Sequence, residues 1–384
     1  MKMKSGRLPG ILLAMCCILA GCSRQDRVAR ALPGTTGGQM PAGQYPLPPG
    51  RVELPWGSVD ADTEVLDLSC LTREQVDAAA EKLPLLNKVT QVELGASELT
   101  PGDVLRLRKA LPEAEFHYCF TLLGQPVSTT DKAVEIVNAA APDGYEQELR
   151  QALELMKDCE ILRLDNCGVE NEVMAQIRED YRGRTKVVWR VFFAKNGSCM
   201  TDRKVIRYVY NMDDSNCSAL KYCEDAEYVD FGHNETLTDC SWAAGMPRLK
   251  AAILSGSLVS DLSGFSACKD LEFLELAYCS RVTDLSPLEN CRKLKMVNTS
   301  FTGVSDFSPL NGAPLERLCS VSSKAPPQEQ ERFRQAHPNC LTLFRGKQPY
   351  GYCWRYEKDG YTPTGYYALL KEVFHYPDTH DTTW

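Results

Sequence analysis

The chain has 384 residues, and its 24% charged and 43% hydrophobic residues are typical of a folded protein and not of a disordered one. The formal net charge of −8 at pH 7 argues against a general nucleic-acid-binding protein, because such proteins present a basic face to phosphate groups. This length allows about two ordinary domains or one long array of repeats.

Residues 1–21 have the pattern of a processing signal. Three basic residues within the first seven positions precede an apolar run, 11–20, that is too short for a comfortable membrane span. The run leads into Leu19-Ala20-Gly21-Cys22, which resembles the lipobox of bacterial lipoproteins. That resemblance implies that Cys22 becomes the first mature residue and carries lipid on its sulfur. A simple secretory signal with an incidental cysteine is the alternative.

Residues 22–60 are rich in proline, glycine, glutamine and arginine and show no hydrophobic periodicity. This composition predicts a flexible tether between the anchor and the folded part. Removal of the signal takes away three basic residues and no acidic one, so the net charge of −8 becomes −11.

Strands and amphipathic helices alternate over residues 61–204. Two blocks of about 70 residues follow one another, and each has three apolar strand patterns and two helical ones. A separate α/β domain in front of the later repeats is the alternative interpretation. The strands are expected near Leu66, Val92, Phe116, Val134, Leu162 and Val187, and the helices over 72–83, 100–111, 145–156 and 172–181.

A shorter unit repeats over residues 205–324. One copy is Leu271, Leu274, Leu276, Cys279 and Val282, with the spacing L-x-x-L-x-L-x-x-C-x-x-V. Each unit then has an aspartate, followed two residues later by a serine that we expect to cap a short helical turn; at Ser286, Glu289 would complete a capping box. The period of 22 or 23 residues indicates a solenoid. The aspartates are Asp239, Asp261, Asp284 and Asp306, and the serines are Ser241, Ser263, Ser286 and Ser308.

These units resemble the leucine-rich-repeat family, whose consensus is L-x-x-L-x-L-x-x-N/C-x-L. The run T-D-L-S-P-L-x-x-C-x-x-L is most similar to the short repeats of bacterial internalins, and the longer units resemble the ribonuclease-inhibitor style. The resemblance implies an α/β solenoid with a parallel sheet on its concave face, helices and turns on its convex face, and a C-terminal cap. The position that is usually asparagine is so only at Asn234, so its hydrogen bonds should be less uniform here.

The repeat pattern ends before residue 325, and 325–384 are predicted to form the cap and a tail. A helix is expected over 328–336 and a strand over 340–344. The aromatic-rich stretch 349–376 is the expected cover for the open end of the solenoid.

No motif for a phosphate-binding loop, a dinucleotide fold, a nucleophile elbow or a zinc protease occurs in the sequence. His375, His380, Asp378 and Asp381 have side chains that bind zinc, but a loose polar tail is the preferred explanation. The repeated aspartates raise calcium as an alternative, which their place before each helical turn makes unnecessary. We therefore expect no catalytic residue, no cofactor and no metal.

Fourteen of the 17 cysteines remain after the signal and the lipidated Cys22 are set aside. None forms a C-x-x-C pair, which excludes zinc-ribbon and redox motifs. Several occupy repeat core positions, where cysteine behaves as a small apolar residue. We expect mostly free, buried thiols, an unusual state outside the cell that hints at an anaerobic host. A few disulfides remain an alternative.

Strand alternation points the residues between the core positions toward the concave side. Ile253, Phe273 and Met296 in adjacent units predict an exposed apolar stripe, a feature that usually marks an interaction site. Cover by the cap or by the N-terminal half is the alternative. The candidate binding residues are Tyr228, Asp230, Ile253, Phe273, Glu275, Met296, Asn298 and Arg317.

The sequence thus favours a monomeric, lipid-anchored extracytoplasmic protein of the bacterial cell membrane that binds a protein or an envelope glycan through its concave face. It predicts no enzymatic activity and no nucleic-acid partner. A surface hydrolase with its site in 61–204 or 340–384 is one alternative, and a structural envelope protein without a discrete ligand is another. A hydrolase needs a deep pocket with convergent polar groups, whereas a binding protein needs an open, partly apolar face.

Overall fold

A computed structural model describes residues 50–346 and 354–376 of the chain. The predicted signal peptide, the lipidation site Cys22 and most of the tether lie outside the described residues, as do His380, Asp378 and Asp381. The C-terminal part of the predicted tether is ordered instead: β1 (Arg51–Leu54) and β2 (Gly57–Asp60) form an antiparallel hairpin whose Leu54 is buried in the core.

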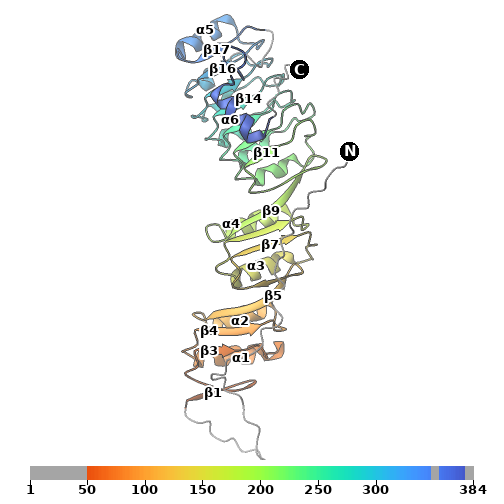
Figure 1. Cartoon of the computed structure of the whole chain (residues 1–384), viewed down its shortest axis with the longest axis vertical. Helices are drawn as coiled ribbons and strands as arrows, with labels where there is room; N and C mark the ends of the chain where they lie inside the picture. Colours follow the sequence, from red (N-terminus) through yellow and green to blue (C-terminus); the bar gives the residue numbers. More distant parts are fainter. Residues whose placement is uncertain (1–49, 347–353, 377–384) are drawn as a thin grey trace, which may run out of the picture. The chain divides into compact units, whose positions relative to one another are not determined.

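Two four-stranded sheets of the same topology follow the hairpin (Figure 1). In each, three parallel strands are joined by helices, and a fourth strand closes a hairpin at the end. The first sheet contains β3 (Val65–Asp67), β4 (Gln91–Gly95), β5 (Glu115–Leu122) and β6 (Gln125–Ser128), and the second contains β7 (Ala133–Val137), β8 (Ile161–Asp165), β9 (Lys186–Phe193) and β10 (Gly197–Met200).

The predicted helices of these two blocks are present. The one expected over 72–83 is divided into η1 (Arg73–Gln75), α1 (Val76–Lys82) and η2 (Leu83–Leu85), because Pro84 in the last turn favours a tighter 3₁₀ turn. The other three are continuous: α2 (Pro101–Ala110), α3 (Tyr145–Leu155) and α4 (Asn171–Asp180).

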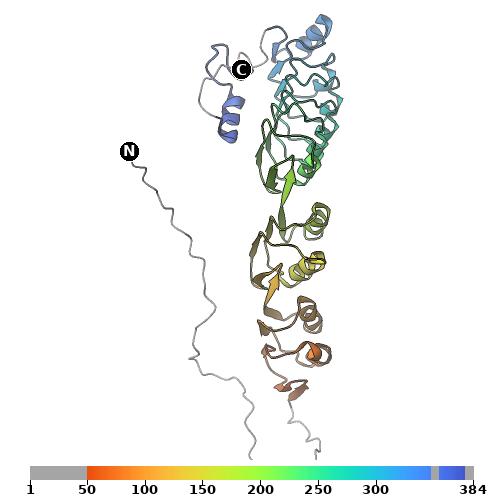
Figure 2. The same ribbon diagram turned by 90° about the vertical axis from the view of Figure 1, so that its right-hand side faces the viewer.

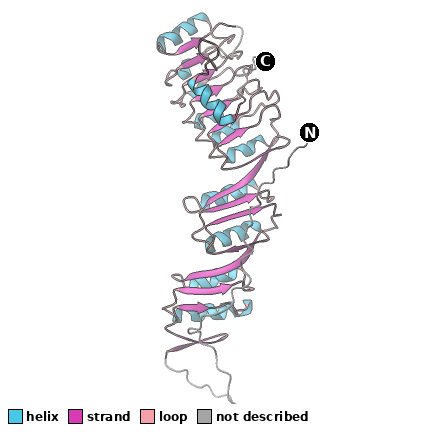
Figure 3. Ribbon diagram, in the orientation of Figure 1, coloured by secondary structure: helices cyan, strands magenta, loops and turns pink. Residues whose placement is uncertain are grey.

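The short repeats form a third sheet of seven parallel strands in chain order. Short 3₁₀ turns, and one helix near the C-terminal end, join the strands on the opposite side from the concave face (Figure 3). The strands are β11 (Val205–Arg207), β12 (Tyr228–Asp230), β13 (Ala251–Ile253), β14 (Phe273–Glu275), β15 (Met296–Asn298), β16 (Arg317–Cys319) and β17 (Leu341–Leu343). The connections are η3 (Cys217–Tyr222), η4 (Ser241–Gly245), η5 (Ser263–Ala267), η6 (Ser286–Leu288), η7 (Ser308–Leu310) and α5 (Pro327–Ala336).

This architecture is a leucine-rich-repeat solenoid, with a parallel sheet on one face and helices and turns on the other. One hydrophobic core runs between the sheets and the helices from Leu54 to Phe344. In the short repeats it contains the middle residue of each strand, such as Leu274, together with Leu276 and Cys279. The strand and helix pattern predicted for the repeats is therefore confirmed.

The expected serine caps are wrong, because aspartate supplies the acceptor. The Asp284 carboxylate accepts hydrogen bonds from the Ser286 backbone N–H at 2.8 Å and from the Ser286 hydroxyl at 2.7 Å. These bonds lower the pKa of Asp284. The serine hydroxyl donates to the carboxylate, so it forms no capping box with Glu289. Asp261 and Asp306 accept the same two bonds from the serine two residues later. Asp239 accepts the bond from the Ser241 backbone N–H.

The asparagine-ladder position varies as expected. Asn234 donates to the carbonyls of Tyr208 and Phe231, both at 2.8 Å, and accepts from the Met212 N–H at 2.8 Å. In a later repeat, the Cys279 thiol donates to the Leu254 carbonyl at 3.1 Å and lies within hydrogen-bond distance, 3.4 Å, of the Ser257 hydroxyl. Ten of the thirteen cysteines in the described residues are buried, and burial raises the pKa of Cys279 to about 11.

We expect Leu276→Asp to destabilise the short repeats by about 3 kcal/mol or more, because the fully buried side chain would become an unpaired carboxylate. The melting transition, followed by circular dichroism, should fall steeply. Ser280→Asp is the matched control, since Ser280 is exposed in the same repeat. Equal melting temperatures for the two variants would show that the repeat register is wrong.

Candidate functional site

The candidate residues lie together on one face of the seven-stranded sheet. Strand pairing from β12 to β16 aligns them in two rows, with the same register at every step. The first row is Tyr228, Ala251, Phe273, Met296 and Arg317, and the second is Asp230, Ile253, Glu275, Asn298 and Cys319. The side-chain directions inferred from strand alternation are therefore correct.

The predicted exposure of the apolar stripe is wrong. Ile253, Phe273 and Met296 are only 4%, 1% and 2% exposed. They belong to a second hydrophobic cluster, separate from the solenoid core, that they share with residues 354–376. This C-terminal segment contains α6 (Gly365–Phe374), which lies on the strand side of the sheet in both ribbon views (Figures 1 and 2). The segment expected to close the end of the solenoid thus packs across its concave face.

Amphipathic spacing explains why this segment suits the face. Thr364 caps α6, because its hydroxyl accepts a bond from the Tyr367 N–H at 3.3 Å. Tyr367, Leu370 and Phe374 then follow at helical spacing and are buried on one side of the helix, while Leu369 is 39% exposed. This amphipathic pattern is visible in the sequence, and it could have identified residues 365–374 as a helix that covers an apolar face.

Aromatic rings form the centre of the contact. The Phe273 ring lies 4.9 Å from that of Trp354 and 5.1 Å from that of Tyr366, measured between centroids. Further along the sheet, Tyr228 meets Phe374 edge to face at 6.5 Å. Stacked and edge-to-face pairs of this kind add to the gain from buried apolar area.

Each acidic candidate residue has a hydrogen-bond donor on the C-terminal segment. Glu275, 1% exposed, accepts from the Trp354 indole N–H at 2.5 Å and from the Arg355 guanidinium at 2.8 Å. Asp230, 4% exposed, accepts from the Tyr376 hydroxyl at 2.5 Å. Burial, and then the adjacent Asp230 carboxylate, raises the pKa of Tyr376, which keeps this hydroxyl a neutral donor.

The remaining polar candidates on the same face also have hydrogen-bond partners. Arg317, half-buried, donates to both carboxylate oxygens of Glu357 at 2.7 and 2.9 Å. Asn298 is fully buried and accepts from the Ser300 N–H at 3.0 Å. The sequence alone did not point to Trp354, Arg355, Glu357 or Tyr376 as partners of this face.

A second aromatic surface lies where the strands of this sheet end. In four successive repeats, a residue there has positive φ and its N–H bonds to a carbonyl of the next repeat, as His233 does to the Ser255 carbonyl at 2.7 Å. These residues are His233, Gly256, Tyr278 and Phe301. Tyr210 stacks on His233 at 5.1 Å, and Tyr278 stacks on Phe301 at 4.6 Å. Gly256 occupies the repeat between these two stacked pairs.

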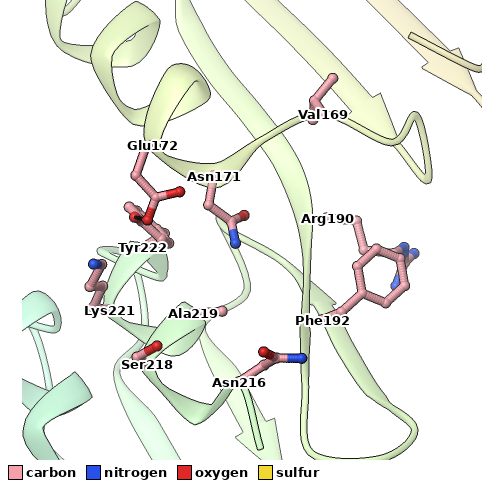
Figure 4. Close-up of a pocket in the computed structure, with 10 residues that line it drawn as sticks. All are labelled: Val169, Asn171, Glu172, Arg190, Phe192, Asn216, Ser218, Ala219, Lys221 and Tyr222. Atoms are coloured by element: carbon pink, nitrogen blue, oxygen red, sulfur yellow. Dashed lines mark hydrogen bonds between the residues drawn. The ribbon is translucent and has the colours of Figure 1, made fainter.

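A cavity of about 360 Å³ lies between α4, β9 and η3 (Figure 4). Its charged residues already have structural contacts: Glu172 accepts from the Tyr222 hydroxyl at 2.7 Å, and Arg190 donates to Asp165 at 2.9 Å. No histidine or cysteine is among the residues that line it.

Over 50–346 and 354–376, no helix is both long and apolar enough to cross a membrane. In the same ranges, no group of three or more histidine, cysteine, aspartate or glutamate side chains has a geometry that could hold a metal ion.

No family model matches this chain, and no curated protein matches it. Among solved structures, an internalin (inlF) from Listeria monocytogenes is 17% identical over 73% of this chain and 89% of that chain, with a TM-score of 0.36. An internalin C2 from the same organism is 14% identical over 66% and 84%, with a TM-score of 0.27. A leucine-rich-repeat protein from Leptospira interrogans is 13% identical over 68% and 74%, with a TM-score of 0.33.

We expect Glu275→Ala to lower the free energy of unfolding by about 2–4 kcal/mol, because it leaves the buried Trp354 N–H without its acceptor and removes the ion pair with the half-buried Arg355. Chemical denaturation measures the change. The neighbouring Glu272 is the control: it is more exposed and pairs with Lys295 at 2.8 Å, so Glu272→Ala should cost less than about 1 kcal/mol. Equal losses would contradict the assigned role of Glu275.

Proposed function

We propose that this protein is a lipid-anchored extracytoplasmic leucine-rich-repeat protein that binds a protein partner through the concave face of its short-repeat sheet. The observation that carries the proposal is that this face already binds a peptide, the C-terminal segment of the same chain. Recognition on it uses aromatic packing around Phe273 and charged anchors at Asp230, Glu275 and Arg317.

The composition of the face supports a binding role. A permanent core is usually apolar, because burying a charge is costly even when the charge is paired. Here two carboxylates, Asp230 and Glu275, lie among Ile253, Phe273 and Met296 on a surface that the C-terminal segment covers. Aromatic and charged anchors of this kind are typical of the centres of protein interfaces.

A protein partner is favoured over an envelope glycan by the shape of the present contact. An amphipathic helix places apolar side chains at regular spacing against the sheet, and Leu370 among them is fully buried. A glycan offers hydroxyl groups and little apolar surface to such a face, so it would leave Ile253 and Met296 poorly covered. A protein partner would therefore cover more of the apolar surface of this face than a glycan would.

Anchoring outside the cytoplasmic membrane is proposed from the sequence motif at Cys22. A single acyl chain holds a protein only marginally, at about 0.8 kcal/mol per buried CH₂ group, so stable attachment needs two or more chains. Bacterial lipoproteins, which the motif resembles, carry at least two. The protein acts there as a monomer without cofactor.

Cys22→Ala should move the protein from the membrane fraction to the soluble fraction, because the sulfur that accepts lipid is removed. Cells expressing either form are fractionated, and the membranes are washed with high salt before immunoblotting. Cys70→Ala, at an exposed cysteine in the folded part, serves as the control and should stay with the membranes. Retention of the Cys22→Ala protein after the wash would contradict the anchor.

Photo-crosslinking tests the binding face. A photoreactive phenylalanine analogue replaces Tyr228, which is half-buried at the start of β12, or Ser280, which is exposed on a turn after β14. We expect the Tyr228 position, and not Ser280, to crosslink in intact cells to one protein, which is then purified and shown to bind the chain directly. A purified partner that crosslinks only at Ser280 would move the site away from the concave face.

A further inference from the structure

We propose that the C-terminal segment, residues 354–376, is an internal ligand that occupies the concave face until a partner displaces it. The partner presents an amphipathic helix with aromatic side chains in place of α6. This inference rests on the proposed function, because it takes the concave face as the binding site and names the class of partner and the way access is controlled.

The solenoid has a complete core without this segment. Within the described residues, the core that runs from Leu54 to Phe344 contains no residue of 354–376. The segment contributes only to the second cluster, on the other side of the strands. The middle residues of the strands, such as Leu274, face the solenoid core and stay buried whether or not the concave face is covered. Departure of the segment therefore exposes one face without opening the fold.

Side chains make the polar contacts between the segment and the sheet. Glu357 binds Arg317 of β16, Trp354 and Arg355 bind Glu275 of β14, and Tyr376 binds Asp230 of β12. The three anchors fall on every second strand, so they are spaced by roughly 9.5 Å along the sheet. Because the segment adds no strand to the sheet, another segment with the same kinds of side chains can replace it.

The segment has a weak tendency to fold by itself, which favours exchange. The α6 helix has ten residues, and isolated helices of this length are marginal in water. Its order depends on the face, where Tyr367, Leu370 and Phe374 are buried. Part of the contact energy is spent on ordering the segment, so a partner helix that is already folded has an advantage.

The face defines the chemistry of that partner. It needs apolar or aromatic side chains at positions i, i+3 and i+7, as in Tyr367, Leu370 and Phe374. It also needs an N–H or guanidinium donor for Glu275 and a carboxylate for Arg317. A peptide with an amphipathic helix like α6, preceded by aromatic and mixed-charge residues like those at 354–357, meets all of these requirements, whereas a uniformly basic or uniformly acidic peptide does not.

The test measures binding of a fluorescent peptide with the sequence of residues 354–376 to the mature full chain carrying Cys22→Ala. Leu370→Asp/Phe374→Asp in the chain releases its own segment, since both side chains are buried against the sheet. We expect this release variant to bind the peptide at least tenfold more tightly than the unreleased chain does. Leu369→Asp, on the exposed side of α6, is the matched control and should bind like the unreleased chain.

A second release variant tests whether the added charges alone cause the effect, and a charge exchange tests where the peptide binds. Trp354→Ala removes the ring that contacts Phe273 without placing a charge against the sheet. For the charge exchange, Arg317→Glu in a released chain should weaken peptide binding, and Glu357→Arg in the peptide should restore it. Restoration would locate the peptide on the concave face.

The inference is overturned if both release variants keep the melting transition of the solenoid but bind the peptide no better than the unreleased chain. It is also overturned if both lose that transition, since the segment would then be part of the structural core. The proposed function fails separately, if the purified envelope partner binds away from this face while the peptide still binds the released chain.

Discussion

The parallel pairing of three-residue strands is the constraint on which the rest of this structure depends. Each strand from β12 to β16 pairs with the next in one register, so the middle residue always faces the helical side. Leu274 and its equivalents thereby join a single core that extends through all three sheets. A slip of one residue would exchange the two sides of the sheet, which is why the repeat period varies so little.

The same geometry creates the proposed binding face. Two residues of every three-residue strand point away from the solenoid core, and in this chain they include Phe273, Ile253 and Met296. Such a row would be exposed to water unless another element covered it. The C-terminal segment supplies the apolar cover, and it also supplies the donors that make buried Glu275 and Asp230 tolerable. The contacts that stabilise this face are therefore the same ones that the proposed binding would use.

Aspartate and serine have separate roles in the turns of the short repeats. The aspartate carboxylate accepts bonds from both the backbone and the hydroxyl of the serine two residues later, as Asp284 does with Ser286. The column of acids along the convex side thus holds the beginning of each turn. Serine and aspartate are both good capping residues, so their order in the sequence did not show which one would supply the acceptor.

The sequence by itself determined the period of the repeats, the alternation that places Phe273 on one side and Leu274 on the other, and the positions of most strands and helices. These features are local, and each is repeated several times, so the copies reinforce one another. Only the tertiary structure decided that residues 354–376 cover the concave face. That contact joins groups far apart in the chain, such as Glu275 with Arg355 and Asp230 with Tyr376, which are separated by 80 and 146 residues. This contact occurs once, so no repeating pattern in the sequence indicates it. It also depends on the fit of one amphipathic helix to a face that exists only after the strands have paired.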